Sequence, residues 1–180
     1  SDVYKRQYNI VPDLFCPAKG FASSLPISAV VGRSEIMDLF GPGEMTSTHS
    51  GNPICAAAAL ANLAVIREQN IVGNARDVGQ LMQQQLSGIR NEFPEVIGAH
   101  HGRGLVGGLH VVEPGSEVPD GRLAMRTIRR AIEKGLMLFA PVGFGGATIK
   151  VCPPLVISQD AILEGAEVLR DSIEAALETK

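Results

Sequence analysis

Apolar side chains recur at three- and four-residue steps in the middle of the chain and again at its end, which predicts amphipathic helices. The first such helix ends before Pro94, and its apolar positions are Val72, Ala75, Val78, Met82, Leu86, Ile89 and Phe93. A second is predicted over 123–134, where Gly135 stops it. A third opens at Ser158 as N-cap, with Asp160 in its first turn and a buried stripe of Ile162, Ala166, Leu169, Ile173 and Leu177.

Short apolar runs between glycines and prolines predict strands. In the first half these runs are 11–16 and 25–31, with Lys19 in the turn between them, and a short helix follows over 34–39. In the second half the predicted strands are 96–99, 105–112, 136–140 and 147–151. The second half is therefore expected to form an α+β module, and the first half to form the end of a larger α/β sheet.

A further helix is predicted after a small, polar segment. Asn52 can cap this helix with Pro53 at its first position, and the helical run continues to Gln69. Nearly every residue of its stretch CAAAALANLAVI is apolar. We therefore expect this helix to be buried on most of its sides.

The pattern suggests four segments along the chain. Residues 1–7 are polar and have no strand or helix period, so they read as an unmatched leader. Residues 8–70 carry the predicted end of the larger sheet, 71–95 a connecting helix, and 96–180 the small α+β domain.

Composition excludes several classes of protein. With 45% hydrophobic and 19% charged residues, the chain has the makeup of a soluble globular protein. A net charge of −3 without a basic stripe argues against a nucleic-acid partner, and no apolar run reaches the roughly 18 to 20 residues that a membrane span needs. Cys16, Cys55 and Cys152 lie far apart, which favours a reducing cytoplasm over a disulfide framework or a zinc site.

Two groups of residues could carry chemistry. Lys19 lies in a turn with small neighbours, and a lysine amine attacks carbonyl groups when it is desolvated. From these residues alone, an ordinary surface lysine remains the favoured interpretation. Ser47 and Thr48 precede a helix, where hydroxyl and backbone N–H groups suit a phosphate, although they could simply cap that helix.

Gly102-Arg103-Gly104-Leu105-Val106-Gly107 fits the spacing of a dinucleotide-binding loop. That loop requires a helix after the last glycine, and the continuation here is typical of a strand. The neighbouring His100 and His101 would point to opposite faces of a strand, so no metal site is expected from them.

The stretch YNIVPDLFCPAKGFASSLPISAVVGRSEIMD, followed by TSTHSGNPICAAAALANL, resembles the class III (ω-amino acid) aminotransferases, which are pyridoxal-phosphate (PLP) enzymes of fold type I. The shared elements are a Pro-Asp strand, a Lys-Gly turn, a Leu-Pro hairpin with a Gly-Arg end, and a Thr-x-small-Gly-Asn-Pro motif. The resemblance runs from about residue 8 to the end of the chain. It implies an α/β fold, in which 8–70 end the PLP-binding large domain and 96–180 form the small C-terminal domain.

The resemblance also implies the roles of individual residues. Lys19 would bind PLP as a Schiff base and then act as the catalytic base, while Thr48, with Ser47, would contact the phosphate held by the partner of a homodimer. Lys150 stands where relatives that use glutamate commonly carry an arginine for the substrate carboxylate, so it is either a substrate ligand or a plain strand-end lysine. A lysine in place of that arginine puts specificity for 2-oxoglutarate in doubt and leaves pyruvate or another 2-oxo acid as a possible acceptor.

The implied activity is transfer of an amino group between an amine or ω-amino acid and a 2-oxo acid. The family's phosphate turn, ring-stacking aromatic residue and pyridine-pairing aspartate lie further upstream than the residues before Lys19. We therefore expect these 180 residues to be a C-terminal portion that is inactive alone. Alternatives are an aminomutase, a phospholyase or a racemase of the same family, or a noncatalytic α/β interaction module.

Overall fold

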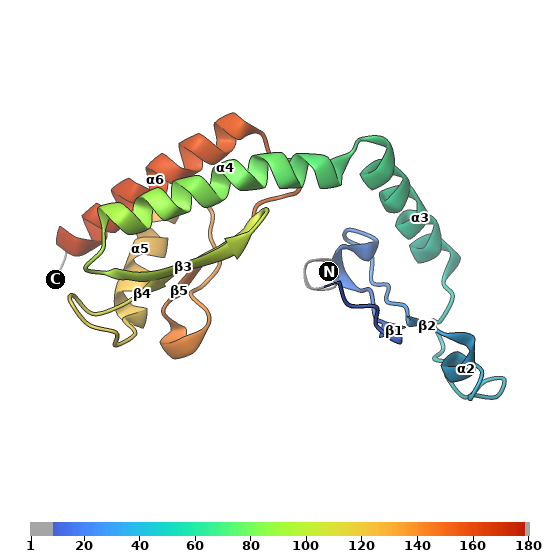
Figure 1. Ribbon diagram of the computed structural model, residues 1–180. Coiled ribbons are helices and arrows are strands. Elements are labelled where there is room, and N and C mark those ends of the chain that lie inside the picture. The colour runs from blue at the N-terminus through green and yellow to red at the C-terminus, as the bar shows by residue number, and fades with distance from the viewer. Residues whose placement is uncertain (1–8, 179–180) are drawn as a thin grey trace. The chain divides into compact units, whose positions relative to one another are not determined.

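The computed structural model describes residues 9–178, which divide into two compact units on either side of the Ile71–Val72 bond (Figure 1). The first unit contains strands β1 (Leu14–Phe15) and β2 (Val31–Gly32), the 3-10 turn η1 (Lys19–Phe21), and helices α2 (Ser34–Met37) and α3 (Pro53–Glu68). The second contains helices α4 (Ile71–Glu92, which begins at the boundary), α5 (Gly121–Glu133) and α6 (Gln159–Glu178), strands β3 (Ile97–Arg103), β4 (Val106–Val111) and β5 (Thr148–Val151), and the turn η2 (Phe144–Gly146).

The second unit is a three-stranded antiparallel sheet in the order β3-β4-β5, packed against three helices. Its core joins the apolar stripe of α4 to those of α5, α6 and the sheet; the fully buried side chains include Met82, Leu86, Ile89, Leu109, Ile149 and Ile173. Helix α4 corresponds to the predicted connecting helix, and it therefore forms one side of this core. An α+β module is confirmed for this part of the chain, and the coarser expectation of an α/β protein holds for the whole.

Local signals placed the helix ends correctly. The Asn52 side chain accepts hydrogen bonds from the backbone N–H groups of Ile54 and Cys55, and the Ser158 hydroxyl accepts one from Ala161. Gly135 ends α5 with a φ of +92°, a conformation that glycine adopts without a steric penalty. The predicted caps of α3 and α6 are therefore confirmed.

Three predicted strands are wrong or much too long. Of 11–16 only Leu14 and Phe15 pair, and of 25–31 only Val31 pairs, with Phe15. The segment 136–140 forms no strand. In that segment Leu136 and Leu138 pack against the core while Met137 and Phe139 are exposed, so the alternation of a strand exists without a pairing edge. Leu177 is also misplaced, because it is 41% exposed and Ala176 takes its place in the core.

Helix α3 is less buried than its sequence predicts. Ala59 is the buried residue of this helix, whereas Ile54 is 71% exposed and Leu60 is 70% exposed. Within the first unit, the contacts to α3 come chiefly from η1. A helix contacted along one side leaves its other apolar faces open, and this is why the prediction of burial on most sides fails.

Candidate functional site: the lysine turn of the first unit

Lys19 lies in a turn that connects two paired strands, as the sequence predicts. Strands β1 and β2 are antiparallel, with Phe15 opposite Val31. Inside the loop, the Ala29 N–H donates to the Pro17 carbonyl at 3.0 Å, and the Phe21 N–H donates to the Ala18 carbonyl at 3.2 Å. The Lys19 residue is exposed, so its amine is open to a small molecule.

The backbone at Lys19 is in the left-handed region, with a φ of +50°. A residue with a Cβ pays roughly 1–2 kcal/mol for that conformation. Strain of this kind persists only where surrounding contacts impose it, and it is found more often at functional sites than elsewhere. The left-handed conformation, which Ser23 in the same loop shares with a φ of +59°, makes this turn a candidate site, and sequence reasoning did not predict it.

The two ends of the loop are joined by residues of the sequence motif. Arg33 Nη1 lies 3.3 Å from Asp13 Oδ1, and the Arg33 N–H donates to the Asp13 carbonyl at 3.4 Å. Both side chains are 68% exposed, so the ion pair alone contributes little to stability. The Arg33–Asp13 contact instead helps to fix the register of the two strands on either side of Lys19.

The hydroxyl segment before α3 does not cap that helix. Asn52 makes the cap, while the Ser47 N–H donates to the Ser50 hydroxyl at 2.9 Å and the two serine hydroxyls lie 3.0 Å apart. Thr48 is exposed. The alternative role that the sequence allows for Ser47 and Thr48, capping the next helix, is therefore excluded. Within residues 9–178, no hydrogen bond joins either of them to Lys19.

Sequence reasoning missed Asn62, which connects α3 to the lysine turn. Its side-chain Nδ2 donates to the carbonyl of Gly20 at 2.9 Å and to that of Phe21 at 3.1 Å. The signal was present in the sequence, because Asn62 is the polar residue inside the apolar run CAAAALANLAVI.

Lys150 belongs to the second unit. It is half-buried in β5 opposite Gly108 of β4, and it alternates with the buried Ile149, so its side chain leaves the sheet on the face opposite to the core. The facing residue has no side chain, and the methyl group of Thr148 lies 3.0 Å from where its Cβ would be. That placement is compatible with either interpretation of Lys150.

The glycine motif over 102–107 is a β-hairpin. Gly102 pairs with Gly107 across the turn, and β4 continues where a dinucleotide loop would begin a helix. The turn lies against α4, where the Gln83 side-chain Nε2 donates to the carbonyls of Gly104 at 2.7 Å and Val106 at 3.1 Å. The dinucleotide interpretation is excluded by the strand after the motif.

His100 contributes to the same hairpin contact. Its Nε2 lies 2.8 Å from Gln83 Oε1, and since that oxygen only accepts, the histidine must donate. Burial lowers the pKa of His100, and the nearby His101 and Arg90 lower it further. Among the described residues, no three His, Cys, Asp or Glu side chains gather as a metal would need. His100 therefore serves the packing of the hairpin.

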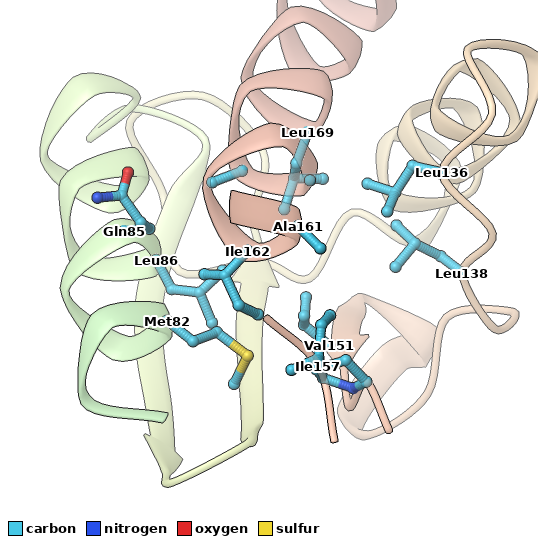
Figure 2. A pocket seen from close by; sticks show the side chains of 13 residues that line it. Met82, Gln85, Leu86, Leu136, Leu138, Val151, Ile157, Ala161, Ile162 and Leu169 are labelled. Atoms are coloured by element: carbon cyan, nitrogen blue, oxygen red, sulfur yellow. The ribbon is translucent and has the colours of Figure 1, made fainter. Parts of the chain in front are cut away.

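The second unit also contains a cavity of about 70 Å³ (Figure 2). Side chains from α4 and α6, such as Met82, Leu86 and Ile162, point into it, and Leu136 and Leu138 close another side. Among residues 9–178, no titratable or nucleophilic side chain lines it. This cavity is a gap in apolar packing, and it offers no reacting group.

Comparisons with known proteins show which family the chain resembles. The family model of class-III aminotransferases matches residues 4–173. The chain is 35% identical over 173 residues to an alanine/serine racemase of Pyrococcus horikoshii, covering 96% of this chain and 36% of the relative. It is 34% identical over 171 residues to a 4-aminobutyrate aminotransferase of Escherichia coli, covering 94% and 40%.

Among solved structures, the chain is similar to aminotransferases. A transaminase from an ancestral-reconstruction study superposes with a TM-score of 0.87 at 30% identity, covering 98% of this chain and 40% of that one. An aminotransferase of Bacillus anthracis gives a TM-score of 0.85 at 31% identity, with 95% and 40% covered.

The curated relatives named above are much longer, since the chain spans 36–40% of their length. No helix within residues 9–178 is long and apolar enough to cross a membrane. Because the family model matches residues 4–173, which is nearly the whole of this chain, the chain belongs to the class-III aminotransferases.

Proposed function

We propose that the complete protein carrying this chain transfers an amino group between an amine or ω-amino acid and a 2-oxo acid, with PLP as cofactor. The observation that supports this most is Lys19, an exposed amine in a strained left-handed turn, at the Lys-Gly motif of an aminotransferase sequence. An amine and exposed hydroxyls are the groups that an aldehyde and a phosphate require, so the residues present fit PLP.

Each residue has a distinct role in this proposal. Lys19 Nζ would hold the cofactor through its aldehyde group, and as a free amine it would take up the proton that the substrate carbon releases. The hydroxyls of Thr48 and Ser47 would donate hydrogen bonds to the phosphate. When bound, PLP supplies an electron sink for the negative charge that proton removal leaves.

We propose a cytoplasmic homodimer in which Thr48 of one subunit serves the phosphate of its partner. Residues 8–70 would then end the fold type I large domain, 71–95 would connect, and 96–180 would form the small C-terminal domain. The exposed side chains of Ser47 and Thr48, and the absence of a capping role, support an intersubunit contact.

A racemase is the second candidate, because one of the relatives at 35% identity carries that name. Racemisation inverts the substrate carbon and leaves its amino group in place, whereas transamination leaves an oxo product and a new amino acid. We expect the complete protein with PLP, a 2-oxo acid and ω-amino acids or amines to form both transamination products. Inversion of alanine or serine without an oxo product would overturn the proposal, and turnover by the 180 residues alone should be slight or absent.

Lys150 is proposed to pair with the substrate carboxylate as a single point charge. The change Lys150→Arg should raise kcat/KM for 2-oxoglutarate about tenfold relative to pyruvate, because a guanidinium can hold with two parallel hydrogen bonds the second carboxylate, which 2-oxoglutarate has and pyruvate lacks. Steady-state kinetics with both acceptors measures this ratio. Lys134→Arg, at an exposed lysine paired with Asp171, is the matched control, and an unchanged ratio in Lys150→Arg would assign Lys150 to the strand alone.

A further inference from the structure

The lysine turn has few restraints of its own. Between Ala18 and Phe21, one backbone hydrogen bond closes the turn, from the Phe21 N–H to the Ala18 carbonyl at 3.2 Å. A side chain built on Gly20 would meet nothing within 4 Å, so packing does not confine the turn at that position. The conformation of Lys19 must therefore depend on other contacts.

Asn62 supplies those contacts from outside the turn. Its Nδ2 has two hydrogens, and it donates to both carbonyls that follow Lys19, those of Gly20 and Phe21. The buried Ala59 lies one helical turn before Asn62. Helix α3, which Asn52 caps, thereby provides a rigid support for the segment that carries the lysine.

The direction of the Lys19 side chain follows from its backbone. If the turn relaxed to the more favourable region of negative φ, the Cα–Cβ bond would point elsewhere. The two Asn62 hydrogen bonds restrain the Gly20–Phe21 and Phe21–Ala22 peptide units, which follow Lys19 in the turn, and so oppose that relaxation. Small displacements of a reacting group are costly, since roughly 1 Å can reduce turnover about a hundredfold.

We infer that Asn62 is a positioning residue, which holds the Lys19 amine in the direction needed for attachment to the cofactor and for proton transfer. This inference rests on the proposed function of Lys19. Asn62 touches the backbone of the turn, so it acts through Lys19 and has no chemical step of its own.

The test compares amide and acid at position 62 in the complete protein. Asn62→Asp keeps the size of the side chain but removes both N–H donors, and Asn62→Gln keeps the amide with one more methylene. Gln69→Glu is the matched control, because it makes the same change of amide to acid just after the last residue of α3, at an exposed side chain.

Three measurements distinguish positioning from folding. The first is the fraction of PLP that borohydride fixes to the Lys19 peptide, found by mass mapping. The second is the visible absorbance of the bound cofactor as a function of pH. The third is the split between kcat and KM. We expect Asn62→Asp to lower kcat by about ten- to a hundredfold with KM changed little. It should also reduce the fraction of PLP fixed at Lys19 and shift the pH dependence of the cofactor's visible absorbance.

Asn62→Gln should recover part of each effect, and Gln69→Glu should match the unmodified protein. The inference is overturned if Asn62→Asp keeps kcat and fixation within twofold, or if both variants lose activity only in proportion to unfolded protein. If borohydride fixes PLP equally well in a Lys19→Ala variant, the proposed function fails instead.

Discussion

Lys19→Ala should abolish fixation of PLP by borohydride and reduce transamination by at least about 10²–10⁴-fold, the contribution that a positioned acid–base group makes. In our proposal Lys19 Nζ both holds the cofactor and moves the proton, so the change removes two functions together. The measurements are mass mapping of the reduced protein and single-turnover kinetics with an amine donor.

Lys19→Arg separates nucleophilic from electrostatic roles. Arginine keeps the positive charge but does not lose its proton in proteins, so it should fail as completely as alanine. Lys134→Ala is the control, because Lys134 is an exposed lysine 3.4 Å from Asp171 and its loss should leave the activity unchanged. Substantial activity in Lys19→Arg would show that charge alone suffices, contrary to our proposal.

Gly79→Ala should destabilise the second unit by about 1–3 kcal/mol, or more if the backbone cannot move. A Cβ at Gly79 would overlap the Cα and carbonyl carbon of Gly104, in the turn between β3 and β4. Backbone atoms cannot rotate away as a flexible side chain can. The Gln83 hydrogen bonds to Gly104 and Val106 would be stretched by the same displacement.

Gly88→Ala is a close control on the same helix. Its Cβ would meet only Arg170 Nη2, at 3.8 Å, which is ordinary contact. Alanine is favoured over glycine inside a helix by about 1 kcal/mol, so Gly88→Ala should be neutral or stabilising. Urea unfolding of both variants gives the difference, and equal stabilities would contradict the close approach of α4 to the hairpin.

The sequence determined the features that depend on near neighbours. The helical stripes of α4, α5 and α6, the caps at Asn52 and Ser158, and the turn at Lys19 all follow from patterns within one or two helical turns. The ordered motif on both sides of Lys19 was likewise sufficient to indicate the family. Side-chain periodicity and capping chemistry are local, so they can be predicted without knowing the fold.

Only the tertiary structure decided which segments meet. The segment 136–140 has the alternation of a strand but no paired edge, and α3 has an apolar sequence but contacts chiefly η1 within its unit. Asn62 lies 42 residues from Gly20, and Gly79 meets Gly104 through a backbone approach that no local pattern records. Strand pairing and backbone packing join residues far apart in the chain, and local side-chain patterns do not specify those partners.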